Sequence, residues 1–176
     1  MRLLAVTVLL LAAIGLGVQA LPAGAGRPAQ AAAQEQTEKE QCLAIIVNRS
    51  NPVENLSFAE LRKIFLGERN HWPNGHRITV VMLDSGRLER QTVIKNVYQM
   101  DERGFNRHFV QATFVGEVFS APKTLATPAG ARKFVFNLPS AIGYVRAEDV
   151  DDSVKVVRVD GHLPGEKGYK LKFETR

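Results

Sequence analysis

A Ser-Gly-Arg turn offers the clearest chemical possibilities in this sequence. Ser85, Gly86 and Arg87 stand between an apolar run and an amphipathic segment, and Arg90 follows three residues later. Ser85 can donate its hydroxyl, Gly86 lets the backbone come close to another molecule, and Arg87 or Arg90 can add a charge-assisted contact. On the residues alone, the simpler interpretation is that Ser85 caps a helix whose charged residues form a solvated face. That face would comprise Arg87, Glu89, Arg90 and Lys95.

Other reactive side chains do not form a recognisable catalytic or metal-binding pattern. His71 and His76 flank Trp72 and Gly75, but no cysteine lies near them, so we do not expect a metal site there. Trp72 is better explained as a buried anchor of its loop than as the wall of a ligand cleft. No nucleophile is paired with a base, and no carboxylate pair sits in a cleft motif. We therefore expect a protein that is not an enzyme and needs no cofactor.

The N-terminus has the pattern of a secretory signal peptide. Arg2 precedes an apolar stretch from Leu3 to Leu16, and small residues around Ala20 follow it. The alternative is a membrane anchor, but a run of about 14 apolar residues is shorter than the ~20 that span a bilayer. We predict a signal peptide over residues 1–20 and a periplasmic or secreted protein without a membrane span after cleavage.

A polar, Ala/Pro/Gly-rich segment separates the signal peptide from the rest of the chain. Residues 21–42 contain no aromatic side chain and cannot bury enough apolar surface to offset the entropy of ordering, which predicts a flexible linker. Cys42 is the only cysteine, so no intramolecular disulfide can form, and we expect a partly exposed thiol without a function. Residues 43–176 remain for one folded domain, a size typical of single domains.

The charge balance of the predicted mature chain is mildly basic. Residues 1–20 contain one base, Arg2, and no acid, so 22 bases face 18 acids in the remainder. This excess suits an anionic ligand or an anionic envelope surface. Bases and acids are interleaved and no basic, aromatic-rich stripe occurs, so we expect no nucleic-acid partner.

Apolar runs alternate with helical patterns along the domain. Leu43–Val47 and Ile78–Leu83 are β-branched runs typical of buried strands. Between them, Ser57 and Glu60 form a capping-box pattern, and Gly67 offers a left-handed helix stop. The same reasoning predicts the remaining elements. These are helices over 87–98, 105–114 and 128–137, strands over 141–145 and 154–159, and an exposed edge strand over 169–173. Such alternation predicts a single three-layer α/β lobe with a mostly parallel sheet.

Several stretches, taken in order, resemble type 2 periplasmic-binding proteins of the phosphate-binding kind that serve bacterial ABC importers. The resemblance covers nearly all of residues 43–173. It rests on Ile46-Val47-Asn48 with Asn51-Pro52-Val53, Leu61-x-x-Ile64-Phe65-Leu66-Gly67 with Trp72-x-x-Gly75, Phe114-x-Gly116 with Pro122, Ala141-Ile142-Gly143-Tyr144-Val145, and Val154-Lys155-Val156 ahead of Asp160-Gly161.

The resemblance implies a binding function for the Ser-Gly-Arg turn. Family members carry a Ser-Gly-Thr turn at a helix N-terminus, where backbone N–H groups and the helix dipole meet phosphate oxygens. Ser85, Gly86 and Arg87 stand at the matching positions, with Arg90 near them. Arg87 replaces the family's threonine and Asp84 adds a negative charge, so binding of phosphate or a related oxyanion should be weak. This chain resembles the short, lone-domain members, in which half of the anion site is absent.

Two further interpretations stay open from the sequence. The inherited fold can have lost its ligand and can present the open face of the lobe to an envelope protein or to a second copy of the chain. A hydrolase of unknown reaction is a weaker alternative. The resemblance favours a solute-binding protein involved in transport.

Overall fold

The computed structural model describes residues 42–116 and 121–173. The predicted signal peptide and residues 21–41 of the predicted linker lie outside the described residues, so both stay predictions. Among the described helices, none is long and apolar enough to cross a membrane.

A five-stranded sheet forms the centre of the described chain, in the order β4-β3-β5-β1-β6. Its strands are β1 (Leu43–Asn48), β3 (Thr79–Leu83), β4 (Lys123–Leu125), β5 (Ala141–Arg146) and β6 (Val154–Val156). A second, two-stranded sheet pairs β2 (Asn55–Leu56) with β7 (Arg158–Val159). The two β-branched runs identified in the sequence become β1 and β3, and the strand predicted over 141–145 becomes β5 between them.

The sheet is mixed, so the expectation of a mostly parallel sheet is not met. β3 pairs in parallel with β4 and β5, but β1 pairs antiparallel with both β5 and β6. Alternating strands and helices predict a parallel sheet only when each helix returns the chain to a neighbouring strand. Here β1 and β3 are not neighbours, because β5 lies between them and runs opposite to β1.

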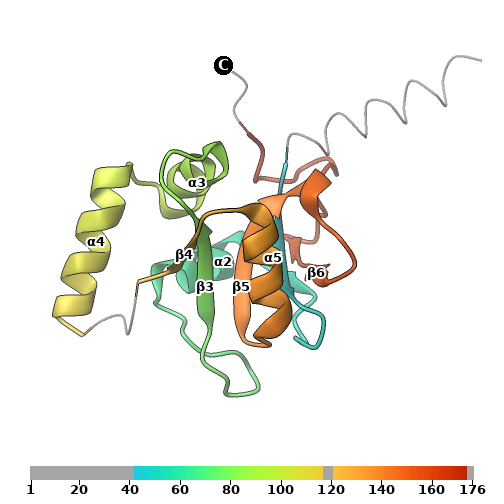
Figure 1. Ribbon diagram of the computed structural model, residues 1–176, viewed down its shortest axis with the longest axis horizontal. Helices are drawn as coiled ribbons and strands as arrows, with labels where there is room; N and C mark the ends of the chain where they lie inside the picture. The colour runs from blue at the N-terminus through green and yellow to red at the C-terminus, as the bar shows by residue number, and fades with distance from the viewer. Residues whose placement is uncertain (1–41, 117–120, 174–176) are drawn as a thin grey trace, which may run out of the picture.

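Helices cover both faces of the sheet, which gives the three layers expected from the sequence. Gly143 faces helix α5 (Pro128–Asn137), since a Cβ built on it would lie 3.6 Å from Val135. The next residue, Tyr144, points to the opposite face, where its ring centroid lies 6.4 Å from that of Phe65 in helix α2 (Phe58–Leu66). Figure 1 shows α5 in front of the sheet and α2 behind it.

Helix α2 begins and ends as its residues predict. The Ser57 hydroxyl accepts from the Glu60 N–H at 3.2 Å, and the Glu60 carboxylate accepts from the Ser57 N–H at 3.0 Å. Gly67 closes the helix with a left-handed φ of 82°. Helix α5 is likewise capped by Thr127, whose hydroxyl accepts from the Gly130 N–H at 3.0 Å. Both predicted helices are confirmed.

The predicted helix over 87–98 divides into two types of turn. An α-helical part, α3 (Leu88–Val93), continues into the π-helical segment η1 (Ile94–Tyr98), which ends at Gln99 with φ of 58°. The next helix, α4 (Glu102–Phe114), starts earlier than expected because the Asp101 carboxylate accepts from the Gly104 N–H at 2.7 Å. A short 3₁₀ turn, η2 (Ala147–Asp149), follows β5.

Two expectations about the ends of the domain are wrong. Residues 169–173 form no strand among the described residues, although Cys42 and Lys172 make an isolated antiparallel bridge. A buried hydrogen bond holds this segment against β1, because the Tyr169 hydroxyl donates to the Leu43 carbonyl at 2.6 Å. Cys42 is fully buried rather than partly exposed, because it continues the apolar strand β1.

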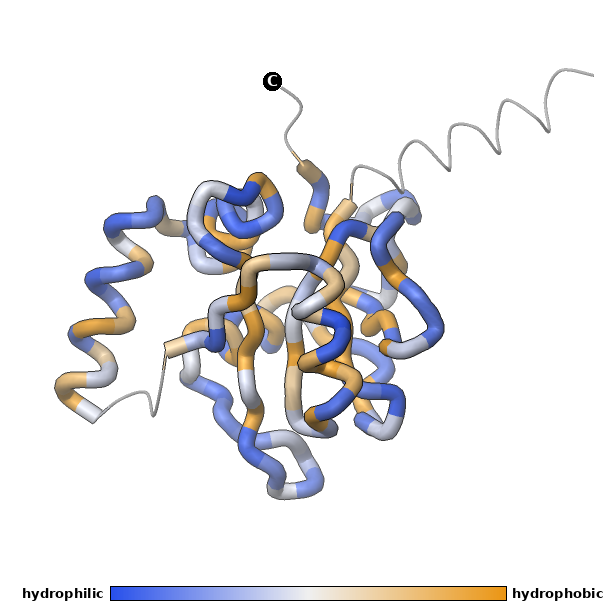
Figure 2. The backbone as a smooth tube through the Cα atoms, viewed as in Figure 1, coloured by the Kyte–Doolittle hydropathy of each residue, from blue (hydrophilic) through white to orange (hydrophobic). Residues whose placement is uncertain are grey.

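The hydrophobic core follows the central strands. All six residues of β1 are buried, and Figure 2 shows hydrophobic segments concentrated along the central strands with hydrophilic segments in the loops. Trp72 is 2% exposed and its indole N–H donates to the Ser140 carbonyl at 3.0 Å. The interpretation of Trp72 as a buried loop anchor is therefore confirmed.

Candidate functional site

The Ser-Gly-Arg turn connects the end of β3 to the start of α3. The Arg87 N–H donates to the Asp84 carbonyl at 3.4 Å, and Gly86 has a φ of 87°, as at the third position of a type II turn. A Cβ at Gly86 would meet no atom within 4 Å, so the backbone there is open to an approaching molecule. Ser85 is exposed and Arg87 is half-buried.

Ser85 does not cap the helix that follows it. The capping position is Arg87, and no side chain makes a cap hydrogen bond there. The turn inserts Gly86 between Ser85 and the helix start, which moves the hydroxyl away from the first helical N–H groups. The simple capping interpretation is therefore wrong.

Neighbouring strands hold the turn in place. The Leu83 N–H donates to the Tyr144 hydroxyl at 3.2 Å, and the Asp84 N–H donates to the Leu125 carbonyl at 3.0 Å. Burial raises the pKa of Tyr144 well above its ordinary value, although the hydrogen bond from Leu83 acts in the other direction. Tyr144 is thus a neutral, buried support beneath the turn rather than an acid or base at neutral pH.

Arg90 is part of the protein interior, not of a solvated face. It is 5% exposed, and its guanidinium makes hydrogen bonds of 3.0 Å and 2.8 Å to one carboxylate oxygen of Glu102. A third donor reaches the Leu83 carbonyl at 3.1 Å, and the guanidinium lies 4.8 Å from the centre of the Phe105 ring. These contacts connect β3, α3 and α4, so Arg90 already has partners inside the fold.

Glu89 places a second buried charge beside the turn. It is 4% exposed and accepts a hydrogen bond of 2.7 Å from Arg146 at the end of β5. Burial alone would raise the pKa of Glu89, but the Arg146 hydrogen bond, its own backbone N–H and the positive charges of Arg146 and Arg87 lower it overall. A negative charge is therefore held permanently at the start of α3 at neutral pH.

From the sequence, Glu89 was expected on a solvated face, and neither Tyr144 nor Arg146 was connected with the turn. The structure instead buries Glu89, which is 4% exposed. Arg146 is 57 positions from its partner, so no local spacing indicates the pair. The sequence indicated only a strand over 141–145, which contains Tyr144 and ends one residue before Arg146. Of the four predicted residues, the structure places Ser85, Gly86 and Arg87 on one open turn and Arg90 in the interior behind it.

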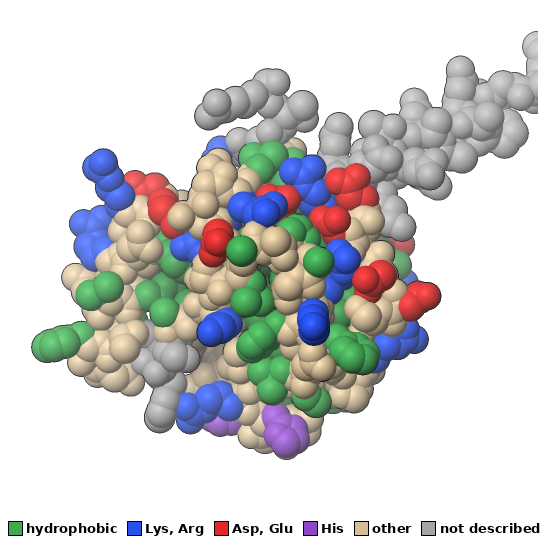
Figure 3. All heavy atoms as spheres, in the orientation of Figure 1, with side chains coloured by type: hydrophobic (Ala, Val, Ile, Leu, Met, Phe, Trp, Pro, Cys, Tyr) green, Lys and Arg blue, Asp and Glu red, His purple; other side chains and the backbone are tan. Residues whose placement is uncertain are grey.

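The charged surface shows no extended patch of one sign on the face seen in Figure 3. Basic and acidic side chains alternate there with apolar ones, and apolar side chains protrude on the α4 side.

Within residues 42–116 and 121–173, no cluster of three or more His, Cys, Asp and Glu side chains could hold a metal ion. The turn therefore offers backbone N–H groups, a hydroxyl and one arginine, which is a set of donors suited to an oxyanion.

Several solved structures of phosphate-binding and phosphate-transport proteins are similar in fold to this chain. No family model matches the sequence. Over 70% of the chain, the fold matches an ABC-type phosphate transport receptor of Vibrio cholerae with a TM-score of 0.57 and 21% identity. A protein of Clostridium perfringens assigned as a phosphate ABC transporter substrate-binding protein, with bound phosphate, matches with a TM-score of 0.57 and 24% identity over 70% of the chain. PstS of Borrelia burgdorferi matches with a TM-score of 0.53 and 15% identity, also over 70% of the chain.

The resemblance to phosphate-binding proteins is thus confirmed for the fold. The chain spans about half the length of these proteins, with coverage of 48%, 46% and 49% of their chains. The α/β lobe with a five-stranded mixed sheet resembles part of a type 2 periplasmic-binding protein. These structural neighbours are named as transport receptors and binding proteins, not as enzymes.

Proposed function

We propose that this protein is an extracytoplasmic solute-binding protein that binds phosphate or a related small oxyanion at Ser85, Gly86 and Arg87. The observation that carries the proposal is the open turn itself, which stands directly before a helix on a lobe like that of phosphate-binding proteins. Ser85 donates its hydroxyl to an anion oxygen, Gly86 brings the backbone N–H groups close, and Arg87 supplies a positive charge.

The affinity of such a site should be low. One lobe can surround an anion on only one side, so the ligand stays partly hydrated and meets few donors. Glu89 adds a repulsive charge at the helix start, and its partner Arg146 is already occupied by that carboxylate. We expect a dissociation constant of about 0.1 to 10 mM for inorganic phosphate.

Arg90 contributes to this function indirectly. Its donors are engaged by Glu102 and Leu83, so it holds the strand end and α4 together behind the turn. A direct contact between Arg90 and the ligand would require the buried guanidinium to leave Glu102 and the Leu83 carbonyl, which is costly. We therefore assign Arg90 as a positioning residue of the proposed site.

Isothermal titration calorimetry with phosphate and with sulfate tests the proposed function. Both anions should bind with one site per chain, and chloride at the same ionic strength should give no heat beyond dilution. Loss of binding in a Ser85→Ala/Arg87→Ala double variant, with Arg107→Ala as the matched control on the exposed face of α4, supports the proposal. Unchanged binding in the double variant contradicts it.

Export to the periplasm or the medium and service to an ABC importer belong to the same proposal. They rest on the signal-peptide pattern of residues 1–20 and on the transport receptors that share the fold. Mass spectrometry of the exported protein should find an N-terminus between Leu21 and about Gln34. Recovery of an intact Met1 chain in the membrane fraction contradicts this part of the proposal.

A second candidate function is an interaction module without a small ligand. The observation that favours it is the outer side of α4, where Val110 is 70% exposed, Phe114 91% and Val115 64%. Light scattering on the purified chain distinguishes the two functions. A dimer that a Phe114→Ser substitution converts to monomer, together with no heat from phosphate, supports the interaction module. A monomer that binds phosphate supports the solute-binding protein.

A further inference from the structure

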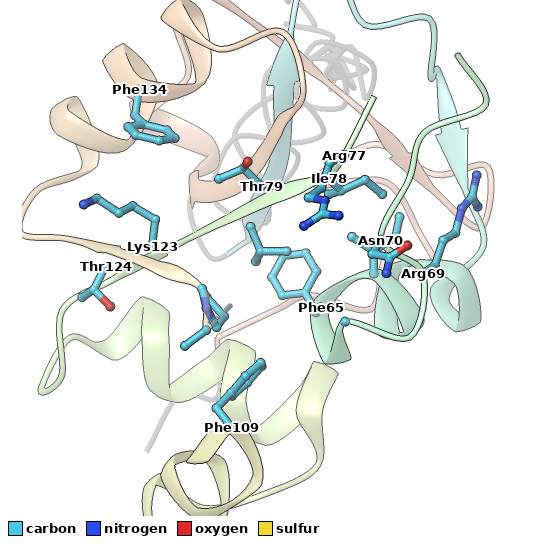
Figure 4. Close-up of a pocket in the computed structure, with 15 residues that line it drawn as sticks. Phe65, Arg69, Asn70, Arg77, Ile78, Thr79, Phe109, Lys123, Thr124 and Phe134 are labelled. Carbon is cyan, nitrogen blue, oxygen red and sulfur yellow. The ribbon is translucent and has the colours of Figure 1, made fainter. Parts of the chain in front are cut away.

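Helix α4 packs on the rest of the fold through one side. Phe105, Phe109 and Ala112 are buried on this inner side. In Figure 4, the Phe109 ring points toward a cavity that Phe65 of α2 also lines. Figure 1 shows α4 at the edge of the molecule, so its opposite side faces away from the sheet. The outer side of α4 is therefore a surface that the fold presents to its surroundings.

This outer side carries exposed basic and apolar residues in one line. At about 100° per residue, four of them fall within an arc of about 60° on the helix surface. They are Arg103, Arg107, Val110 and Phe114. Val110 is 70% exposed, Phe114 is 91% exposed, and Val115 at the end of the helix is 64% exposed. These five residues form the outer stripe of α4, which is basic toward the helix N-terminus and apolar toward its C-terminus.

The arginines of the outer stripe keep their positive charge on the surface. Arg103 and Arg107 are exposed, and within the described part of the chain neither side chain forms an ion pair. Glu102 is the one acid of α4, and it pairs with the buried Arg90 at 2.8 Å. Asp101 precedes the helix and is engaged as its N-terminal cap. The stripe thus presents two positive charges beside an apolar end.

We infer that the outer stripe of α4 binds the surface of an anionic phospholipid membrane. Phe114 and the two valines insert among the head groups and upper acyl chains, and Arg103 and Arg107 contact lipid phosphates. The mild basic excess of the predicted mature chain favours the same kind of surface. The inference does not rest on the proposed solute-binding function, because no residue of the stripe belongs to the Ser-Gly-Arg turn.

The exposed apolar area favours a membrane over a second copy of the chain. The three apolar side chains together expose on the order of 400 Å², whereas a stable protein interface buries about 800 Å² on each partner. Pairing two copies of the stripe would also bring four arginines into one interface, with no acid from either stripe to balance them. A lipid surface needs no matching shape and supplies phosphates to the arginines.

Co-sedimentation of the exported protein with lipid vesicles tests the inference. The protein should bind vesicles of phosphatidylcholine that contain about 30% phosphatidylglycerol, and it should bind pure phosphatidylcholine at least about fivefold more weakly. Raising sodium chloride to about 0.5 M should weaken binding to the anionic vesicles by a similar factor, because salt screens the attraction between arginine and phosphate. Equal binding to both kinds of vesicle, or binding to neither, would overturn the inference.

Tryptophan substitutions locate the contact by fluorescence. Phe114→Trp should show a blue-shifted emission when phosphatidylglycerol vesicles are added, because the indole leaves water. The native Trp72 is 2% exposed, so its emission should stay constant. The matched control is Phe136→Trp, at a 54% exposed phenylalanine on α5, which should show no shift. No shift for Phe114→Trp, or an equal shift for the control, contradicts the assignment.

Substitutions within the stripe separate its apolar and basic contributions. Phe114→Ser should weaken vesicle binding about tenfold, and Arg103→Gln/Arg107→Gln should weaken it at least about fivefold and remove most of its salt dependence. Phe136→Ser and Lys133→Gln, both at exposed positions of α5, are the matched controls. Circular dichroism verifies that each variant is folded. Unchanged binding in the stripe variants, or a dimer in light scattering that Phe114→Ser converts to monomer, would overturn the inference.

Discussion

The two ends of β3 differ in how the protein treats its positive charges. At the end that leads to α3, each buried charge has an opposite partner, since Arg90 contacts Glu102 and Glu89 contacts Arg146. At the start of the strand, Arg77 and Lys123 line a cavity, and the described lining residues include no acid. The balanced pairs near the turn hold strand and helix ends together in the interior.

The buried charges near the turn therefore have a structural role. Near the turn, binding capacity is confined to the backbone N–H groups, the Ser85 hydroxyl and Arg87, because the other arginines already donate to carboxylates. A weak oxyanion site at the turn is the expected consequence. Substitutions at each charge pair test this account.

The largest effect is expected for the Arg90 pair. Arg90→Met removes the contacts to Glu102 and leaves the Leu83 carbonyl without that donor, which should lower the free energy of unfolding by about 2 to 3 kcal/mol. The Glu102 side chain is 39% exposed and can rehydrate, which limits this loss of stability. Urea unfolding measures the change, with Arg107→Met on the exposed side of α4 as control. A loss of phosphate binding without a loss of stability would instead make Arg90 a ligand contact.

A smaller effect with a characteristic pH dependence is expected for Glu89. Glu89→Gln should cost about 1 to 2 kcal/mol at pH 7, because it weakens the hydrogen bond to the partly exposed Arg146. The folded-state pKa of Glu89 lies below its ordinary value of 4.5, so its stabilisation is complete above that pH and is lost as the pH falls through the folded-state pKa. The difference between wild type and variant should therefore shrink below about pH 4. A constant difference from pH 7 to pH 3 would contradict this assignment.

The Glu89→Gln variant should also change phosphate binding. Without the negative charge, repulsion at the helix start disappears and Arg146 is held less tightly, although Glu148 still pairs with it at 3.6 Å, so phosphate affinity should rise about three- to tenfold. Calorimetry at pH 7 measures this change. Unchanged or reduced phosphate affinity would show that the charges of Glu89 and Arg146 do not affect an anion bound at the turn.

Tyr144 should show an effect of about 1 kcal/mol on stability. Tyr144→Phe keeps the ring against Phe65 but removes the hydroxyl that accepts from the Leu83 N–H. Thermal or urea unfolding measures the cost, and hydrogen exchange should accelerate at Leu83 in particular. Undiminished protection at Leu83 would mean that this hydrogen bond does not hold the turn.

Local sequence patterns predicted those elements whose boundaries are set by neighbouring residues. The capping box of Ser57 and Glu60 and the stop at Gly67 each act within one helical turn, and both are confirmed. Strand β1 was likewise recognisable because every residue in it is buried. The four short pieces β2, β4, β6 and β7 depend on partners far along the chain and were missed or merged.

The candidate site was predictable only in part for the same reason. Ser85, Gly86 and Arg87 could be selected from a turn pattern and a family resemblance. The burial of Glu89 and Arg90 could not, because their partners Arg146 and Glu102 come from other elements. The antiparallel direction of β1 also depends on where β5 inserts, which no local pattern encodes.

The most direct test of the solute-binding proposal is an NMR titration of the ¹⁵N-labelled domain with inorganic phosphate. Shifts should be largest at the amides of Ser85, Gly86 and Arg87, with a dissociation constant of about 0.1 to 10 mM, and should vanish in Ser85→Ala/Arg87→Ala. Absence of shifts at the turn up to about 100 mM phosphate, at constant ionic strength, would contradict the proposed function.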